Sequence, residues 1–499
     1  MKNLKYIALL CVTVICLTSC GRDFLEPEVK NYITEEEKNE LQKDPKTLAN
    51  LVTASIAINY NTLQGFWASH DDFGLRAFQL ATDMMTADIA YYGGWFQYDY
   101  KYGNFEANYR RTNSTWGQWY DVVAKVNVVL RDFFPGDTTD PALLASKATP
   151  LALRGIAYYH LANFYQATYI GHEDKMGVPL PLKPEDENFP RATLRETYAR
   201  IVDDLSTAVK YGSVTPDHTD VDKSVAAAYL AKAYADMKQW DKVEEYAKIA
   251  QEGAADAVLA FPPSWNVGNG DVLWGFDVTP ITSTLWASFY SHMDPTLKYY
   301  AGGGQEKYIY NWLYAQMGKK DVRKSLFIHN ADNPEIAKKL GFENYVDKEG
   351  KEHNFDYIAV KFKTKPDEAA NTDYVYLRVQ DPILLEIEAL VEQNKLPAAT
   401  AKLKAFMTPR DEDFKPGATQ EELRKQVRIQ RRIELWGEGT AWFDLRRWNE
   451  EVDRTLAPEG GETNHGYILK KNLNDIENIH KIPQREINNN KNLKQNDEE

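Results

Sequence analysis

The sequence predicts a mainly α-helical protein, in which a tetratricopeptide-like helical repeat scaffold carries an irregular, loop-rich lobe with short strands. Three observations lead to this fold class. Apolar residues recur at helical spacing through the first half of the chain, and one helix pair there has the spacing of a tetratricopeptide repeat. The helical period then disappears for a long stretch and returns before the C-terminus.

Helical spacing is clearest between residues 45 and 253. Within residues 194–209 the apolar side chains lie three or four positions apart, which places them on one face of a helix, and residues 153–164 show the same spacing. Residues 224–251 contain two helices joined near Lys238, with small and apolar residues where tetratricopeptide repeats pack helix against helix. Because one such pair cannot bury its apolar faces alone, we expect several pairs stacked as a curved array.

The region between residues 261 and 373 differs in composition. Glycine, proline and aromatic residues are frequent in it, and no helical period is visible. Two runs within it, residues 272–278 and 357–362, have strand-like composition. Helical spacing returns in three later segments, at residues 374–392, 396–407 and 421 to about 436.

These patterns divide the chain into five predicted segments. The polar stretch 488–499 at the end of the last segment is expected to fray. The five segments are a signal peptide (1–19), a lipid-anchored tether (20–43), the helical scaffold (44–255), the irregular lobe (256–372), and C-terminal helices that complete the scaffold before a polar tail (373–499).

The first twenty residues have the features of a bacterial lipoprotein signal. Lys2 and Lys5 precede a mostly apolar run, residues 6–17, which is too short for a membrane-spanning helix of about 20 residues. Residues 17–20, Leu-Thr-Ser-Cys, fit the L-x-[AS]-C pattern, so we expect cleavage before Cys20 and lipidation of that cysteine. More than one acyl chain makes such anchoring stable. The alternative is an ordinary secreted protein with an incidental cysteine.

Composition limits the classes of partner. Two of the three cysteines, Cys11 and Cys16, lie in the signal, so the mature chain keeps one cysteine and can form no internal disulfide. The chain carries 73 Asp and Glu against 59 Lys and Arg, a formal net charge of −14. This charge argues against nucleic acid and against attraction to anionic lipid, and we expect no nucleic-acid partner.

The sequence lacks several motifs that are typical of enzymes. The nine histidines contain no H-E-x-x-H pair, and the chain has no G-x-S-x-G elbow and no phosphate-binding G-K-[ST] loop. We therefore assign no catalytic residue, no metal site and no cofactor. Acidic pairs occur by chance among 73 carboxylates, so a glycoside hydrolase with paired acids stays open as an alternative.

One acidic set is ordered along the chain. Arg431, Glu434 and Glu438 lie three and four positions apart and would share one side of a continuing helix. The two acids could be a catalytic pair, or members of an ion-pair network that fixes the C-terminal helix to the scaffold. Arginines beside both acids would lower their pKa values, the reverse of what a general acid needs, so we favour the structural interpretation.

Aromatic residues cluster in an early segment. Twelve of the thirty residues from Tyr91 to Tyr120 are aromatic, against 12% of the whole chain. Several lie beside the glycine pair 93–94, which is typical of loops, and large rings on loops are costly to expose unless something covers them. A sugar ring has an apolar C–H face that a flat ring can cover and a hydroxyl rim that polar side chains can bind. The candidate glycan contacts here are Trp95, Phe96 and Tyr98.

Other aromatic groups carry different expectations. Each of these rings could instead fill the interior of the scaffold. We expect an interior position for the three rings that lead into a helix over residues 122–130, namely Trp116, Trp119 and Tyr120. A second aromatic stretch lies in the irregular lobe, and its rings are further candidates for ligand contact: Trp286, Phe289, Tyr290, Tyr299 and Tyr300.

Several motifs occur in an order typical of one protein family. In chain order they are Cys20 with Asp23-Phe24-Leu25, Arg154-Gly155-Ile156-Ala157-Tyr158-Tyr159, Gly177-Val178-Pro179-Leu180, Pro190-Arg191-Ala192-Thr193, Arg378 with Leu384 and Glu388, Arg431-Arg432-Ile433-Glu434-Leu435 with Trp442-Phe443-Asp444-Leu445-Arg446-Arg447-Trp448, and Ile482-Pro483-Gln484-Arg485-Glu486-Ile487. The set at 431–448 is the most specific. Together the motifs resemble the SusD/RagB family, the surface lipoproteins of starch-utilisation-like systems in Bacteroidetes, over nearly the whole chain.

The resemblance implies a tetratricopeptide-repeat scaffold with an irregular second lobe. It also implies a nutrient-binding lipoprotein, anchored in the outer membrane and facing the exterior, that binds oligo- or polysaccharide and hands it to a SusC-like TonB-dependent outer-membrane transporter. In this family the glycan lies against an aromatic platform built from an early loop and a later one. By position that platform falls here on Trp95, Phe96, Tyr98 and Asp88 and on Trp286, Tyr290 and Tyr299.

Two alternatives to glycan capture remain from the sequence. The first is a secreted or surface glycoside hydrolase. Because some members of the family carry peptides, the second is a peptide-binding relative or a pure scaffold whose repeat groove holds protein.

Overall fold

The computed structural model describes residues 40, 43–65, 69–134, 136, 138–254, 261, 263, 265–364, 371–456 and 469–496. The first 48 residues form one unit, and residues from Ala49 onward form a second. The predicted signal and Cys20 lie outside the described residues, so cleavage and lipidation stay predictions. Among the residues that are described, no helix combines the length and the apolar composition needed to cross a membrane.

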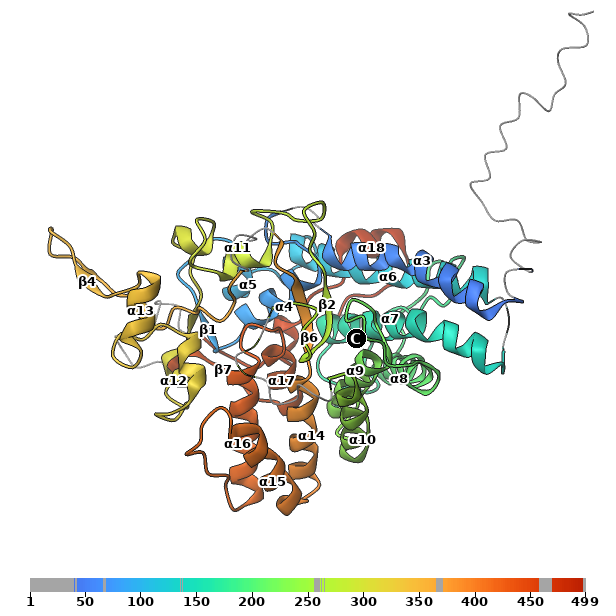
Figure 1. Ribbon diagram of the computed structural model, residues 1–499. Coiled ribbons are helices and arrows are strands. Elements are labelled where there is room, and N and C mark those ends of the chain that lie inside the picture. The colour runs from blue at the N-terminus through green and yellow to red at the C-terminus, as the bar shows by residue number, and fades with distance from the viewer. Residues whose placement is uncertain are drawn as a thin grey trace, which may run out of the picture. The chain divides into compact units, whose positions relative to one another are not determined.

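Five helices packed in chain order form the scaffold. Each packs against the next, and the last also packs against α14 (Gln380–Glu392). Figure 1 shows this array from cyan to green. It confirms the predicted tetratricopeptide-like fold class. The five are α6 (Arg110–Phe133), α7 (Pro141–Tyr165), α8 (Leu194–Tyr211), α9 (Lys223–Asp236) and α10 (Trp240–Ala250).

Local sequence explains how α8 begins and how closely it packs. The Thr193 hydroxyl accepts a hydrogen bond from the Glu196 backbone N–H, and the Glu196 carboxylate accepts one from the Thr193 N–H, which is a capping box. Ile201 and Leu205 on the apolar face are fully buried. A Cβ at Gly155 of α7 would lie 2.7 Å from Leu205 Cγ, so a glycine is needed for this close helix packing.

The predicted helix pair at residues 224–251 is confirmed as α9 and α10. The chain turns between them at Lys238, whose φ of 54° lies in the left-handed region. Helix α9 packs against α7, α8, α10 and α14. Because it is surrounded, nearly all of its residues are buried, and its many alanines allow neighbouring helices to approach closely.

The C-terminal helices complete the scaffold. Helix α14 packs against α15 and α16 as well as against α10, which places the orange and red helices beside the green ones in Figure 1. The predicted helix at residues 396–407 is confirmed. These helices are α15 (Leu396–Met407), α16 (Gln420–Glu434), α17 (Ala441–Trp448) and α18 (Gln484–Asn489).

Two predictions at the C-terminal end are wrong. The predicted helix at 374–392 starts later, because residues 374–378 form a strand whose aromatic and β-branched side chains are all buried. The tail beyond residue 488 was expected to fray, yet its described part is packed. Leu493 is buried, and the Asn496 amide donates a hydrogen bond to the His480 carbonyl.

Strands form four antiparallel pairs in the part of the chain that the structure describes. The predicted strand near residue 272 is confirmed, whereas residues 357–362 form only isolated bridges, from Ile358 to Tyr308 and from Ala359 to Phe327. The pairs are β1 (Ile89–Ala90) with β3 (Tyr308–Ile309), β2 (Val272–Phe276) with β6 (Tyr374–Arg378), β4 (Tyr345–Val346) with β5 (Glu352–His353), and β7 (Val452–Asp453) with β8 (Lys470–Lys471).

Short elements make up the remainder. The early segment contains α3 (Pro45–Gln64), α4 (Leu75–Met84) and α5 (Gln97–Tyr100). The lobe contains α11 (Phe289–Met293), α12 (Asn311–Tyr314) and α13 (Pro334–Leu340). Single 3₁₀ turns occur at Gln251–Ala254, Ala301–Gly303, Val322–Leu326, Arg454–Leu456 and Ile476–Asn478.

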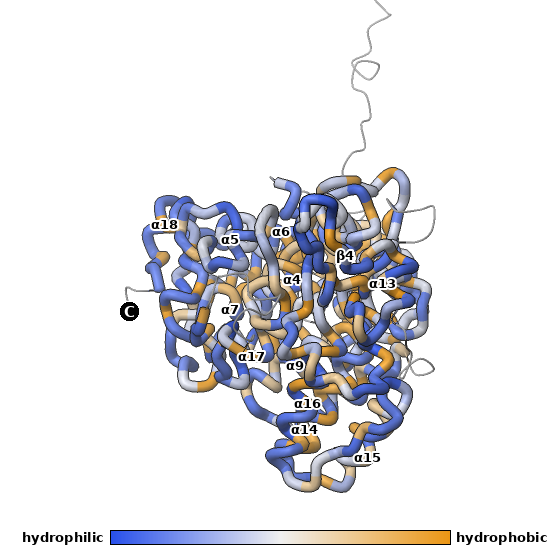
Figure 2. Tube along the Cα trace, turned by 90° about the vertical axis from the view of Figure 1, so that its left-hand side faces the viewer, coloured by the Kyte–Doolittle hydropathy of each residue, from blue (hydrophilic) through white to orange (hydrophobic). Residues whose placement is uncertain are grey.

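Apolar side chains fill the interior. Figure 2 shows the apolar positions, in orange, mostly inside a periphery of polar positions in blue. Trp119 is fully buried and stacks on His160 with ring centroids 4.3 Å apart, and Trp116 is also buried. The predicted core placement of these two tryptophans is confirmed.

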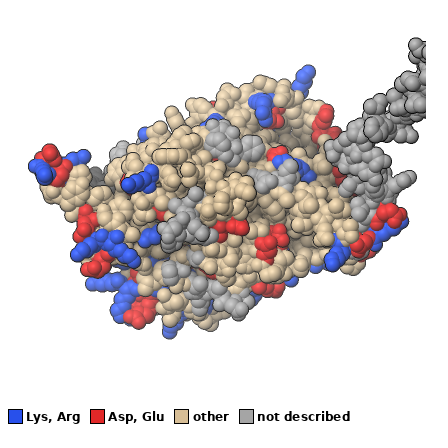
Figure 3. Space-filling model, turned by 45° about the horizontal axis from the view of Figure 1, so that its top comes forward, with Lys and Arg blue, Asp and Glu red and all other residues tan. Residues whose placement is uncertain are grey.

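Charged side chains lie mostly at the margins of the face in Figure 3. Lys and Arg lie next to Asp and Glu there, with a broad uncharged area between them. No large area of one sign of charge is visible on this face.

Candidate functional site

The two predicted aromatic stretches meet through Tyr300. The Tyr300 ring lies 5.8 Å from the ring of Trp95 and 4.9 Å from that of Trp286, in both cases at an interplanar angle of 66°. Trp286 also contacts Tyr299, at 5.0 Å. One continuous group of rings therefore joins the early loop to the lobe. We call Trp95, Trp286, Tyr299 and Tyr300 the aromatic platform.

The loop that carries Trp95 is fixed by strand pairing and by one glutamine. The β1–β3 pair brings the segment before Tyr308 beside the early loop. There the Trp95 backbone N–H donates to Gln305 Oε1 at 2.9 Å. Gly93 and Gly94 adopt φ values of 141° and 118°, which other residues rarely reach, and a Cβ at Gly94 would lie 2.2 Å from Gln305 Oε1.

Two histidines pack against the platform. His70 stacks on Trp95, with centroids 5.6 Å apart, and its Nδ1 hydrogen-bonds the Tyr300 hydroxyl. His292 stacks on Tyr300, with ring centroids 4.8 Å apart, and its Nε2 lies 3.0 Å from the His70 carbonyl oxygen. Burial lowers the pKa of His292 to about 3, so this ring is neutral and serves as a packing surface.

A hollow of about 660 Å³ opens beside Trp95. Tyr98 and Tyr109 present their rings to it, with exposed fractions of 64% and 47%. A volume of this size is typical of a ligand site, which usually spans about 300–1,000 Å³. The polar residues of the lining are Ser69, Asp71, Gln97, Asn104, Arg110 and Gln305.

An ion-pair cluster forms the charged part of the hollow. Arg110 Nη2 lies 2.7 and 2.8 Å from the two carboxylate oxygens of Asp71, and Arg110 Nη1 pairs with Asp72. Beneath them, buried Arg111 pairs with Asp72 at 2.8 Å and with Asp99 at 3.0 Å. Burial alone would raise the pKa of Asp71, but Arg111 and Arg110 bring it below its ordinary value, so this carboxylate is ionised.

Four of the predicted contacts lie in exposed or half-buried positions. Trp95 and Tyr98 line the hollow, and Trp286 and Tyr299 belong to the platform. Trp286 is 43% exposed, whereas Trp95 and Tyr299 are half-buried. Their part in binding stays a prediction.

Phe96 is placed differently from its neighbours. Phe96 forms part of the wall of the hollow, but only 2% of the residue is exposed. The ring meets His292 edge to face at 5.1 Å and lies beneath the guanidinium of Arg111, at 5.4 Å. Phe96 therefore supports the loop from inside, and the expectation that it offers a face to a ligand is corrected.

Asp88 and Tyr290 are buried away from the hollow, and their predicted role as contacts is corrected too. Asp88 pairs with Arg432, whose Nε lies 2.8 Å from Asp88 Oδ1, and its carbonyl accepts from the Trp436 indole. The Tyr290 hydroxyl donates to the Asp373 carbonyl at 2.7 Å. Both residues join the early loop and the lobe to the C-terminal part of the chain.

Tyr109, Arg110, His70 and His292 were missed by the sequence-based prediction. Tyr109 belongs to the aromatic-rich segment but stands just before α6, with no local sign that it faces the same hollow as Trp95. His70 precedes the early loop by more than twenty residues, and His292 lies within the second aromatic stretch, in α11, where the sequence gives no sign that its ring packs against Tyr300.

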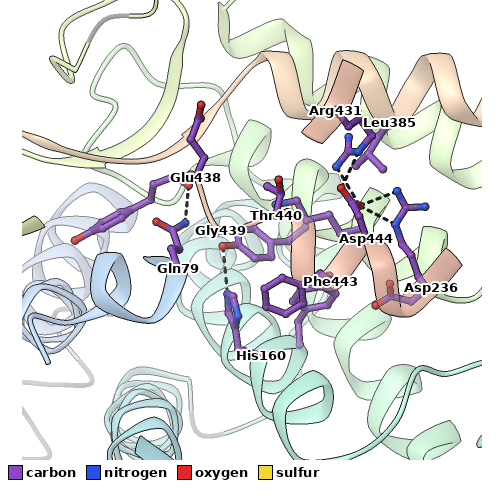
Figure 4. A pocket seen from close by; sticks show the side chains of 15 residues that line it. Gln79, His160, Asp236, Leu385, Arg431, Glu438, Gly439, Thr440, Phe443 and Asp444 are labelled. Atoms are coloured by element: carbon purple, nitrogen blue, oxygen red, sulfur yellow. Dashed lines mark hydrogen bonds and ion pairs between the residues drawn. The ribbon is translucent and has the colours of Figure 1, made fainter. Parts of the chain in front are cut away.

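A second hollow is enclosed within the scaffold and is drawn in Figure 4. His160, Asp236 and Asp444 are among the side chains around it, and dashed lines connect Asp444 with Arg431. Arg447 also pairs with Asp444, at 2.8 Å. Its volume of about 30 Å³ is enough for roughly one or two water molecules. This cavity is too small for a sugar.

The ordered acidic set near this cavity is structural, as expected. Glu434 accepts from Arg410 at 2.7 and 3.0 Å, and Glu438 accepts from Arg378 at 2.7 and 2.9 Å and from Lys361 at 2.6 Å, all in buried positions. Burial would raise the pKa values of both acids, but these cations bring them below the ordinary value. Neither acid suits general acid catalysis.

A third hollow, of about 660 Å³, lies between α6, the segment near Pro181 and α18. Trp116 in its wall is buried, and the Tyr120 hydroxyl donates to the Pro179 carbonyl. Asn127 donates to the Pro181 carbonyl in the same way. This hollow matches the first in volume but offers fewer free ring faces. No cluster of potential metal ligands occurs among the described residues.

Comparison with known proteins was decisive for the family. Residues 31–235 match the family described as starch-binding and associating with the outer membrane, and residues 329–498 match the SusD family. The chain belongs to the SusD family. The first match reaches from before α3 almost to the end of α9, and the second includes the C-terminal helices. The description of the first family associates such proteins with the outer membrane.

Individual SusD-family relatives are distant in sequence but alike in fold. The chain is 21% identical to SusD-like protein P2 of Formosa agariphila over 66% of this chain and 70% of that protein. A SusD-like carbohydrate binding protein of Bacteroides vulgatus has a TM-score of 0.73 at 23% identity, covering 89% of this chain and 97% of its own. A SusD superfamily protein of Bacteroides thetaiotaomicron has a TM-score of 0.72 at 18% identity, covering 90% and 99%.

Proposed function

We propose that this protein is a surface lipoprotein that binds oligo- or polysaccharide without cleaving it and hands it to a SusC-like TonB-dependent transporter. The observation that carries the proposal is the hollow beside Trp95, in which exposed tyrosine rings lie next to a paired Asp71 and Arg110. Membership of the SusD family supports glycan binding, as does the match to a family described as starch-binding.

The ring geometry suits the apolar face of a sugar. Trp286 and Tyr98 are exposed enough to be covered by a ligand, and Trp95 belongs both to the platform and to the lining of the hollow. Rings joined edge to face offer successive surfaces along a chain of sugars. The histidines beneath keep the rings in place before any ligand arrives, which reduces the entropy lost on binding.

The polar side chains suit the hydroxyl rim. Asp71 is ionised and can accept from sugar hydroxyls, while Arg110 has N–H groups beyond those paired with carboxylates, and its side chain is 35% exposed. Hydrogen bonds to charged partners are about twice as strong as those between neutral groups. Asn104 and Gln97 add amide groups to the same lining.

The electrostatics of the hollow support binding without cleavage. A glycoside hydrolase needs one carboxyl with a raised pKa and a second carboxylate about 5–9.5 Å away. Among the described residues that line the hollow, Asp71 is the acidic one, and its pKa is lowered. Carboxyls with raised pKa values, such as Asp83 at about 8 and Asp236 at about 6, lie buried in the interior.

The test is incubation of the purified protein with a panel of polysaccharides, measuring retention on affinity gels and release of reducing ends. We expect retention by at least one polysaccharide and no release of reducing ends. Release of reducing ends would contradict the proposal in favour of the hydrolase. Retention by no glycan, with binding of peptides instead, would favour a peptide-carrying relative.

A further inference from the structure

The charged groups around the hollow carry no net positive charge. Three carboxylates, on Asp71, Asp72 and Asp99, share two guanidinium groups, on Arg110 and Arg111. All three acids and Arg111 are buried, and Arg110 is the group of the cluster that reaches the solvent. The cluster is therefore locally neutral or negative.

Arg110, the exposed cation of this cluster, already pairs with two carboxylates. Both oxygens of Asp71 accept from Arg110 Nη2, and Asp72 accepts from Arg110 Nη1. The two acids bring the pKa of Arg110 above its ordinary value despite burial, which is the sign of a strongly held pair. An anionic ligand could reach only the N–H groups that Arg110 leaves unpaired, where the charges of Asp71 and Asp72 repel it. Drawing Arg110 away from them would leave buried carboxylates without that partner, which is unfavourable.

The nearest buried lysine does not supply a cation to the hollow. Lys307 follows Gln305 closely in the chain, but its amino group donates to the Gln305 carbonyl and lies over the Tyr91 ring, 4.2 Å from the centroid. Only 2% of the residue is exposed. Among the described residues of the lining, Asp71 and Arg110 are the charged ones.

Resting on the proposed function, we infer that this hollow selects uncharged sugars and rejects sugars that carry carboxylate or sulfate groups. A neutral hydroxyl can donate to Asp71 and accept from Arg110 while their pairing stays intact. In the described lining a carboxylate or sulfate finds no cation other than the paired Arg110, and it meets a cluster without net positive charge. The formal charge of −14 on the whole chain opposes anionic polymers in addition, although salt screens this longer-range term.

The first test compares neutral and anionic polysaccharides by isothermal titration calorimetry in 150 mM salt. Neutral probes are amylopectin, laminarin, galactomannan and levan, and anionic probes are polygalacturonate, alginate and dextran sulfate. The neutral probe that binds best is also compared with its own 6-carboxylated derivative. We expect the derivative to bind about tenfold more weakly or worse.

The outcomes separate the inference from the proposed function. Equal or tighter binding of anionic probes, lost in a Trp95→Ala variant, would leave glycan capture standing and overturn the selectivity. Binding by no probe of either class would overturn both, because the inference depends on glycan capture at this site.

A second test adds a cation to the hollow. Gln97 lines it at the start of α5 and is half-buried, so Gln97→Lys places an unpaired charge there. We expect the ratio of anionic to neutral affinity to rise about tenfold in this variant. Gln316→Lys adds the same charge at an exposed position outside the lining and is the matched control. An equal rise in both variants would assign the selectivity to overall charge and overturn the inference.

Discussion

Trp95 and Tyr300 meet edge to face, with ring centroids 5.8 Å apart. Trp95 follows the glycine pair of an early loop, whereas Tyr300 lies in the lobe that comes after the scaffold helices in sequence. Their contact depends on the β1–β3 pair and on the hydrogen bond from Trp95 to Gln305. The platform therefore forms only in the folded chain, and changes at this junction should weaken binding.

Gly94→Ala is expected to weaken glycan binding about fivefold or more. The new Cβ would displace Gln305, which holds the Trp95 backbone, and the φ of 118° would become strained. The strain should also lower the free energy of unfolding by about 1–3 kcal/mol. Gly171→Ala, at φ 86° with no atom within 4 Å of a Cβ, is the control for strain alone. Similar losses of affinity in both variants would contradict the role of Gln305.

Phe96 and Tyr98 should respond in opposite ways to truncation. Phe96→Ala removes a buried ring and should lower the free energy of unfolding by about 3–5 kcal/mol. Tyr98→Ala removes an exposed ring, so stability should change by about 0.5 kcal/mol or less while a neutral glycan binds roughly threefold more weakly or worse. Chemical denaturation and calorimetry measure both quantities. Unchanged affinity in Tyr98→Ala would remove this ring from the site.

Glu438→Gln should lower the stability of the protein. The affinity of the folded protein for glycan should stay unchanged. It leaves Arg378 and Lys361 buried without their carboxylate, at a cost of about 3–5 kcal/mol. Because the folded-state pKa of Glu438 is lowered, its stabilising effect is present above the unfolded value of 4.5 and is lost as the pH falls through the folded value. The difference in the free energy of unfolding between Glu438→Gln and wild type should therefore shrink as the pH falls. A difference that stays constant until Glu438 is fully protonated would show that the ionised carboxylate is not its cause.

Asp83 should show the opposite dependence on pH. Burial raises its pKa to about 8, so the folded state holds a proton that the unfolded state releases above about pH 4. Stability contributed by the protonated carboxyl is present below the unfolded pKa and declines as the pH rises toward 8. Asp83→Asn keeps an acceptor for the Gly439 N–H, at 2.7 Å in wild type, and removes the titration. We expect this variant to gain a few kcal/mol relative to wild type between pH 5 and 8.

Denaturation of Asp83→Asn and wild type at pH 4, 6 and 8 checks this. A stability difference that does not grow with pH would show that Asp83 ionises normally in the folded protein.

The spacing of apolar and small residues predicted the helices whose positions depend on local sequence. The spacing in α8 and the small residues of α9 and α10 identify helices because each element buries a face or is surrounded. Residues 374–378 were misassigned because a fully buried strand and a buried helix start look alike in composition, and only pairing with β2 decides between them.

The candidate site was predictable in location but not in every side chain. Glycines beside rings identify the loop of Trp95 and Tyr98. The same pattern cannot tell that Asp88 turns inward to Arg432 or that Phe96 packs on His292, because those partners are supplied by distant segments. Arg110 was missed for a similar reason, since its two partners precede α4.

The most direct test of the account is the affinity of Trp95→Ala and Trp286→Ala for the neutral polysaccharide that wild type binds best, measured by isothermal titration calorimetry. Tyr345→Ala, which removes an exposed ring in β4, is the control. We expect each tryptophan variant to bind about tenfold more weakly, with a melting temperature close to that of wild type and no change in the control. Unaltered affinity in both tryptophan variants would contradict the assignment of the aromatic platform as the glycan-binding surface.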